Sequence, residues 1–94
     1  MSNTVKHITL RVYGHVHGVF FRASTKEKAQ ELGLTGFVQN EADGTVYIEA
    51  EGNAEALKQL EQWAHEGPRR AKVEKVEVKE MGDLVGFKEF KVKR

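Results

Sequence analysis

Residues 7–22 join an alternating segment, a short turn bracketed by two glycines and the beginning of a helix in direct succession. Residues 7–13 alternate apolar side chains with polar or aromatic ones, as a strand with one buried face requires. Gly14 and Gly18 bracket the turn, and Arg22 follows at the start of the helical segment. A strand, a tight turn and a helix in this order begin a strand–helix–strand unit, in which the helix packs against the sheet.

Arg22 breaks a local rule of helix formation. The N-terminus of a helix carries partial positive charge and unpaired N–H groups, so a cation there costs a few tenths to about 1 kcal/mol unless an anion lies between the two. The glycines of the preceding turn accept backbone conformations in which consecutive N–H groups point toward a common centre. The sequence therefore predicts a site for an anion the size of phosphate between this turn and Arg22.

The size and charge of the chain exclude several classes of protein. Its 94 residues are enough for one core, and we expect residues 1–94 to form a single domain. The 15 basic and 14 acidic residues leave a net charge of +1, so no whole-protein field attracts nucleic acid or a membrane. The absence of cysteine excludes disulfides, a thiolate nucleophile and a cysteine-ligated zinc site. With neither a membrane-spanning run nor a secretory signal, we expect a cytoplasmic protein.

Turn and capping signals divide the chain into two helices and five strands. Gly33 suits a left-handed helix end, Asp43-Gly44 marks a tight turn between two strands, and Asn53 is a favourable N-cap. The expected strands lie at residues 7–13, 35–40, 45–51, 71–80 and 87–93, the first helix at 23–32, and the second helix between Asn53 and Gly67-Pro68.

Two of these elements carry packing expectations. The apolar stripe of the first helix, Ala23, Ala29 and Leu32, is thin, so this helix should lie close against the sheet. In the strand at 71–80, the apolar residues change parity part-way along. We therefore expect a β-bulge near Glu74 and Lys75, because a one-residue slip would otherwise turn half of the apolar set to water.

The order of the elements predicts an α+β fold. We expect a ferredoxin-like βαββαβ sandwich, with two helices on one face of an antiparallel-type sheet and a short extra C-terminal strand. A right-handed strand–helix–strand unit makes the first two strands parallel, so their C-terminal ends emerge at the same edge of the sheet. With the third strand between them, Asn40 would lie across a small gap from the turn at residues 14–18.

The residue types at this gap limit its chemistry. Arg22 offers a planar fork of donors for two phosphoryl oxygens, and Asn40 offers a neutral carboxamide that can hold a water molecule. Phosphoryl transfer passes through a loose transition state, so orientation and charge stabilisation matter more than a strong base. A carboxylate at position 40 would be repelled by a phosphate dianion, whereas asparagine is not. Without a metal set the substrate needs a good leaving group, which a mixed carboxylic–phosphoric anhydride provides.

Two motifs at these positions resemble the acylphosphatase family, which hydrolyses carboxyl phosphates. The first consists of a glycine, a valine-containing turn, a second glycine and Phe-Arg, here Gly14, Val16, Gly18, Val19, Phe21 and Arg22. The second is Gly-aromatic-Val-x-Asn followed by a glycine turn, here Gly36, Phe37, Val38, Asn40, Asp43, Gly44, Val46 and Gly52. The similarity continues from Gly67 to Phe90 and covers almost the whole chain.

The resemblance implies hydrolysis of acyl phosphates to a carboxylate and inorganic phosphate, with no metal or other cofactor. It implies that Arg22 and Asn40 are catalytic, Arg22 by binding phosphate and Asn40 by orienting the attacking water. It further implies that phosphate is bound by the backbone of a loop, namely His15, Val16, His17, Gly18, Val19 and Phe20. His17 stands where the family usually has glutamine, a change that alters loop packing or local charge but removes no backbone donor.

Three alternatives use the same residues or the same fold. His15 and His17 alternate like a metal-chelating pair, but they lack a third ligand, so we expect no metal. The same element order serves RNA-recognition domains, yet the RNP signature and a net basic charge are missing. A non-catalytic anion-binding regulatory fold is the third, against which the intact Arg22 and Asn40 argue. We expect a monomer whose partners are a small-molecule acyl phosphate and its product inorganic phosphate, with no nucleic-acid or membrane partner.

Overall fold

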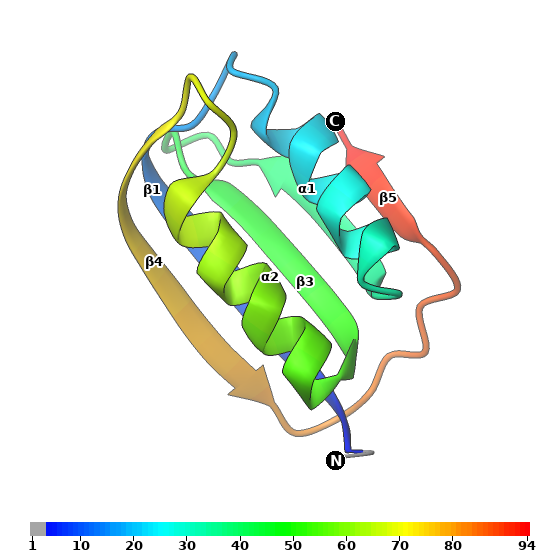
Figure 1. Ribbon diagram of the computed structural model, residues 1–94. Coiled ribbons are helices and arrows are strands. Elements are labelled where there is room, and N and C mark those ends of the chain that lie inside the picture. Colours follow the sequence, from blue (N-terminus) through cyan, green and yellow to red (C-terminus); the bar gives the residue numbers. More distant parts are fainter. Residues whose placement is uncertain (1–3) are drawn as a thin grey trace.

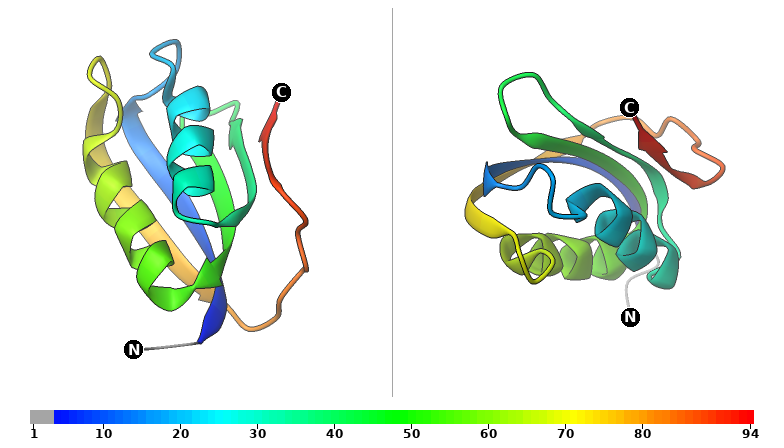
Figure 2. Two further views of the ribbon diagram at one scale, coloured as in Figure 1. Left: turned by 45° about the vertical axis from the view of Figure 1, so that its right-hand side comes forward. Right: turned by 90° about the horizontal axis from the view of Figure 1, so that it is seen from above.

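The computed structural model describes residues 4–94, in which two helices cover one face of a five-stranded sheet (Figure 1). The two helices lie side by side on that face, as the end-on view in Figure 2 shows. The elements are β1 Val5–His15, α1 Phe21–Glu31, β2 Thr35–Asn40, β3 Val46–Asn53, α2 Ala54–Glu66, β4 Lys72–Met81 and β5 Phe90–Lys93.

The strand order β4-β1-β3-β2-β5 confirms the ferredoxin-like sandwich. β3 lies between β1 and β2 and is antiparallel to both, so β1 and β2 are parallel to each other. The short last strand, β5, pairs with β2 in parallel, which makes the sheet mixed. Because β1, β2 and β5 all run in the same direction, their C-terminal ends lie at the same end of the molecule, uppermost in Figure 1.

A β-bulge interrupts the pairing of β1 with β4. The register shifts after Tyr13, and Glu74 lies between the paired residues without a partner on β1, which confirms the bulge expected near Glu74 and Lys75. Gly14 follows with φ 126°, where a Cβ atom would lie 2.1 Å from the carbonyl oxygen of Lys72. Only glycine fits this close approach, so the bulge and Gly14 together let the chain leave the sheet toward the loop before α1.

The buried face of α1 differs from the expected stripe of Ala23, Ala29 and Leu32. The helix begins at Phe21, two residues earlier than expected, and its buried residues are Phe21, Thr25 and Ala29. Ala23 is exposed, so its assignment to the core was wrong. The cause is the ring of Phe21, which packs inward and fixes which side of the helix faces the sheet. Positions four and eight residues later then follow it to that side.

The expected helix caps are confirmed. At the end of α1, the N–H of Leu34 donates to the carbonyl of Ala29 at 2.8 Å, across Gly33 in the left-handed conformation. At the start of α2, the Asn53 side chain accepts from the N–H of Glu55 at 2.9 Å. The residues of α2 buried against the sheet are Leu57, Leu60 and Ala64.

Residues 82–89, which connect β4 to β5, cross the face of the sheet that the helices leave open (Figure 2). They cover His7, whose Nδ1 donates to the carbonyl of Asp83 at 2.9 Å and whose ring packs edge-on against Phe87. His7 is therefore buried, although the alternation of residues 7–13 predicted a solvent-facing side there. Thr9, on the same side of the strand, is buried as well. Because Phe87 belongs to this crossing, the last strand begins at Phe90 rather than at residue 87. Neither helix of residues 4–94 is long and apolar enough to span a membrane.

Candidate active site

β1, β2 and β5 end at the same end of the sheet (Figure 1). Residues at these strand ends line a hollow of about 540 Å³. Four segments surround it: the loop after β1, the first turn of α1, the last residue of β2 and the end of β5. The residues that line it are Val16, Gly18, Phe20, Phe21, Arg22, Ala23, Asn40, Val92 and Arg94. The gap expected between residues 14–18 and Asn40 is therefore a real depression in the surface.

The loop at residues 16–20 borders this hollow through Val16, Gly18 and Phe20. Val16 and Val19 are buried in the core, which fixes the loop from within. Gly18 and Phe20 have positive φ values of 70° and 63°, which turn successive peptide groups. None of the hydrogen bonds found within residues 4–94 uses the backbone N–H of residues 16–20. Free N–H groups on a turning backbone next to a helix N-terminus are well suited to an anion.

His17 fastens the loop to the neighbouring hairpin. Its Nε2 donates to the carbonyl of Thr45 at 2.8 Å, so this nitrogen carries the proton. Thr45 is itself fixed, because its hydroxyl donates to Asp43 at 2.6 Å and accepts from Arg11 at 2.9 Å. The hydrogen bonds from the Thr45 hydroxyl and N–H hold the pKa of Asp43 below its usual value. His17 thus has a packing role that a glutamine amide could also fill.

Arg22 is the second residue of α1 and lies at the wall of the hollow. Its Nη1 donates to the carbonyl oxygen of Lys93, the last residue of β5, at 3.1 Å. The first turn of α1 contains no acidic residue, and its N-cap, Phe20, supplies no side-chain acceptor. The guanidinium and the helix N-terminus therefore place two unneutralised positive ends at one site.

Asn40 is the last residue of β2, where it pairs with Val46 of β3, and it lines the hollow. Its Oδ1 is buried and has no hydrogen-bond partner within residues 4–94. An unsatisfied buried carbonyl oxygen costs roughly 1–3 kcal/mol, so such an atom calls for a water or a ligand group as its donor. Asn40 therefore brings an unpaired acceptor to the group of residues that line the hollow.

The hollow gathers five of the eight site residues expected from the sequence, namely Val16, Gly18, Phe20, Arg22 and Asn40. The other three are His15, His17 and Val19, whose expected role concerns the backbone. Their side chains point elsewhere: His15 is exposed, His17 faces Thr45, and Val19 enters the core.

Two lining residues, Val92 and Arg94, were missed by the sequence analysis. The pattern at residues 87–93 indicates a strand but not its neighbour, so nothing in the sequence placed its end beside β2. Ala23 was assigned to the wrong face of α1 and lines the hollow instead.

Over nearly its whole length the chain is similar to proteins of one family. The Acylphosphatase family model matches residues 8–92. A curated acylphosphatase from Marinobacter nauticus is 49% identical over 88 residues, which cover 94% of this chain and 96% of the relative. The solved acylphosphatase structure from Coxiella burnetii has a TM-score of 0.91 at 38% identity, over 95% of this chain and 93% of that one. The Bacillus subtilis acylphosphatase structure has a TM-score of 0.92 at 32% identity, over 97% and 100% of the two chains.

Proposed function

The chain belongs to the acylphosphatase family and hydrolyses acyl phosphates, and we propose that the loop at residues 15–20, Arg22 and Asn40 carry out this reaction. The observation that carries the proposal is their convergence on one hollow, which unites unpaired N–H groups, a guanidinium and an unpaired carboxamide oxygen. The RNA-binding alternative is not favoured, because part of the open sheet face it would need is covered by residues 82–89.

In the proposed complex the phosphoryl group lies between the loop and Arg22. The N–H groups of residues 16–20 and the N-terminus of α1 bind its oxygens, and the free part of the Arg22 guanidinium closes the cradle. One guanidinium nitrogen of Arg22 donates to the Lys93 carbonyl oxygen, so the Arg22 side chain is oriented before the substrate binds. Orientation in advance lowers the cost of binding and lets the donors act on the charge that develops on the phosphoryl oxygens.

Asn40 orients the attacking water through its Oδ1. The water oxygen forms a bond to phosphorus while the bond from phosphorus to the acyl oxygen breaks, and its electron pair leaves with the carboxylate. The water protons pass to the phosphate product and the solvent. Because the carboxylate is a good leaving group and the transition state is loose, a neutral residue suffices and no strong base is required.

The test is phosphate release from acetyl phosphate in the presence of a chelator. Arg22→Ala should lower kcat/KM by roughly 100- to 1000-fold, the loss typical for one donor to a transition-state oxyanion. Arg69→Ala, an exposed arginine outside the lining of the hollow, is the matched control. No turnover by the unaltered protein, or equal turnover by Arg22→Ala, would refute the role of this site.

Asn40→Ala separates a water-positioning role from a phosphate-binding role. We expect kcat to fall roughly 100-fold while the inhibition constant of inorganic phosphate changes less than about threefold, because positioning acts on the transition state. Asn40→Asp should weaken phosphate binding instead, since a carboxylate repels the dianion. A collapse of phosphate affinity in Asn40→Ala would make this residue a phosphate ligand.

The proposed setting is a monomeric single domain acting in the cytoplasm, without a nucleic-acid partner. The absence of cysteine supports a reducing compartment, and the net charge of +1 argues against a nucleic-acid partner. A solution mass near 10.6 kDa would agree with the monomer, and a dimer mass would refute it.

A further inference from the structure

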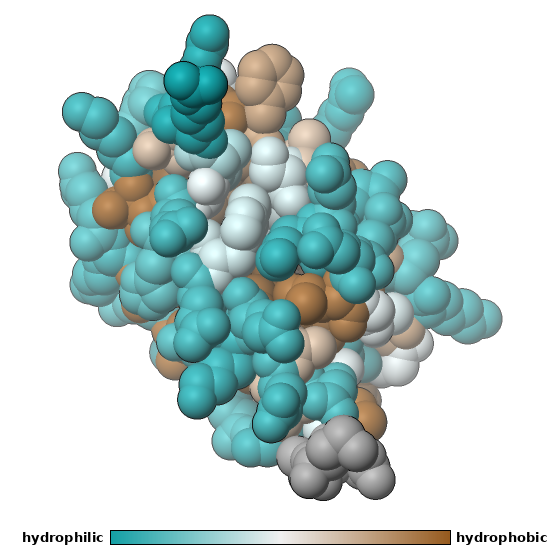
Figure 3. All heavy atoms as spheres, viewed as in Figure 1, coloured by the Kyte–Doolittle hydropathy of each residue, from teal (hydrophilic) through white to brown (hydrophobic). Residues whose placement is uncertain are grey.

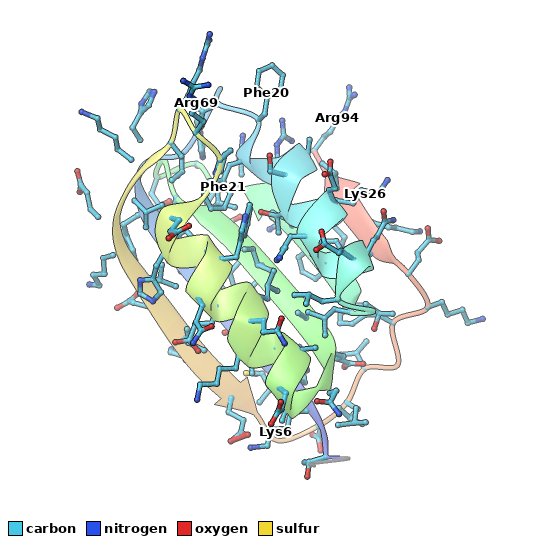
Figure 4. The ribbon with its side chains drawn as sticks, viewed as in Figure 1. Lys6, Phe20, Phe21, Lys26, Arg69 and Arg94 are labelled. Carbon is cyan, nitrogen blue, oxygen red and sulfur yellow. The ribbon has the colours of Figure 1, made fainter. Side chains whose placement is uncertain are left out.

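Phe20 is the most exposed large apolar side chain among the residues that the structure describes. Its exposed fraction is 76%, compared with 61% for Val85, the next in order. The following residue, Phe21, points inward between the helices, whereas the Phe20 ring extends outward beyond the first turn of α1 (Figure 4). In the same view of the surface, an apolar side chain projects among hydrophilic ones at this end of the molecule (Figure 3).

The backbone of Phe20 adds a second cost to this exposure. Its φ of 63° and ψ of 21° are left-handed, and it is the one residue other than glycine with positive φ in residues 4–94. Glycine or asparagine would adopt this conformation with less strain. Neither the exposed ring nor the strained backbone of Phe20 stabilises the fold. Strained residues of this kind cluster at functional sites, and Phe20 borders one.

Phe20 lies on an apolar part of the hollow. Ala23, which is exposed on α1, and Val92, which is 37% exposed on β5, line the same depression. These three residues come from the loop before α1, from α1 and from β5, and they line the same hollow as Arg22 and Asn40. The site therefore has a polar part that suits a phosphoryl group. It also has an apolar part, which a phosphoryl group would not bind.

The direction of the reaction places the acyl group against this apolar part. In phosphoryl transfer, the attacking and leaving oxygens lie roughly in line on opposite sides of phosphorus. In the proposed mechanism the water is held at Oδ1 of Asn40, which is a buried atom. The leaving carboxylate then points away from this buried atom, toward the exposed side of the site, to which the Phe20 ring belongs.

We propose that Phe20, Ala23 and Val92 form an acyl-binding subsite that favours substrates with an aromatic or large apolar acyl group. The inference rests on the proposed function, because the phosphoryl group must first lie between the loop and Arg22. An aromatic acyl group can stack against Phe20 with an offset, which removes one face of each ring from water. An acetyl group is too small to cover the ring.

The test compares kcat/KM for benzoyl phosphate and acetyl phosphate in the unaltered protein and in Phe20→Ala. We expect the benzoyl-to-acetyl ratio to fall about five- to tenfold, the effect of losing an aromatic contact. Taking the ratio cancels any loss that the two substrates share, such as a change in the phosphate loop. Phe20→Tyr keeps the ring and should keep the ratio within about twofold.

Two further variants separate the ring from the backbone and from general surface hydrophobicity. Phe20→Asn removes the ring but tolerates the left-handed backbone. Because only the ring should matter, the benzoyl-to-acetyl ratio should fall in this variant as it does in Phe20→Ala. Leu84→Ala removes another exposed apolar side chain, 55% exposed and outside the hollow, and should leave the ratio unchanged. An unchanged ratio in Phe20→Ala and Phe20→Asn, with both substrates still cleaved, would overturn the subsite alone. If the unaltered protein cleaved neither substrate, the proposed function would be overturned, and the subsite with it.

Discussion

Glu51→Gln should destabilise the protein by releasing the segment that crosses the open face of the sheet. Glu51 is only 5% exposed, and its carboxylate accepts hydrogen bonds from the backbone N–H groups of Val85 and Gly86. His7 lies beside it, with 3.6 Å between Nδ1 and the nearer carboxylate oxygen. One buried carboxylate thus holds residues 82–89 against β1 and β3.

The expected magnitude follows from these contacts. A glutamine amide has one acceptor oxygen, so one of the two N–H groups is left facing an NH₂ group, at a cost of about 1–3 kcal/mol. The other hydrogen bond loses its charge-assisted character, worth about 1 kcal/mol. Removing the buried charge recovers part of this loss. We therefore expect a decrease of about 2–3 kcal/mol in the free energy of unfolding, or roughly 10–20 °C in Tm for a domain of this size.

Urea denaturation at pH 7, with Glu80→Gln as the matched control, measures this difference. Glu80 pairs with Lys6 at 2.8 Å, but both side chains are exposed, so the control should change the free energy of unfolding by less than about 0.5 kcal/mol. Equal stability of the two variants would refute the argument that Glu51 holds the crossing segment.

The same carboxylate predicts a pH dependence. Burial alone would raise the pKa of Glu51, but hydrogen bonds from the N–H groups of Val85, Gly86 and Phe87, with the attraction of His7, hold that pKa below its usual value of 4.5. A carboxyl whose pKa is lower in the folded state stabilises the fold above its unfolded pKa and loses this contribution as pH falls through the folded one. The free energy of unfolding should therefore fall less between pH 5 and pH 2 in Glu51→Gln than in the unaltered protein.

Three further predictions concern the loop, the hairpin and the sheet face. Gly14→Ala should cost more than about 3 kcal/mol in urea denaturation, because its Cβ would lie 2.1 Å from the Lys72 carbonyl oxygen at a φ of 126°; a change below about 1 kcal/mol would contradict this. His17→Gln should keep the hydrogen bond to Thr45 and change the free energy of unfolding by less than about 0.5 kcal/mol, whereas His17→Ala should lower it by about 1 kcal/mol. Equal decreases in the two variants would show that glutamine does not replace this bond. Burial and a hydrogen bond to a carboxylate raise the pKa of Tyr47 to about 12, so its tyrosinate absorbance should appear well above pH 10.

The elements that the sequence predicted well are those specified by neighbouring residues. The strand at 35–40 has the same bounds in the structure, Asn53 caps α2, and the bulge lies at Glu74. In each case the signal is local: an alternation, a capping side chain or a change of parity within one strand. The parallel arrangement of β1 and β2 was also predictable, because the strand–helix–strand rule restricts handedness.

The features that the sequence did not predict depend on contacts between distant segments. The alternation at residues 7–13 indicates one buried face, but His7 is buried on the other face because residues 82–89 lie over it. The start of α1 was placed too late because the packing of Phe21 against Trp63, with ring centroids 5.5 Å apart, outweighs helix propensity. Val92 was missed as a lining residue because a short strand does not specify its neighbour.

Arg22 connects the site to the rest of the fold in a way that explains its unfavourable position. It donates to the Lys93 carbonyl oxygen, and none of the ion pairs found within residues 4–94 includes it. A carbonyl orients one nitrogen of the guanidinium without neutralising its charge, whereas a carboxylate would compete with phosphate for the fork. Lys93 is fixed in turn by β5, which is parallel to β2 and follows the segment held by Glu51. The fold therefore keeps the cation ordered and unneutralised, which favours binding of a dianion with little reorganisation.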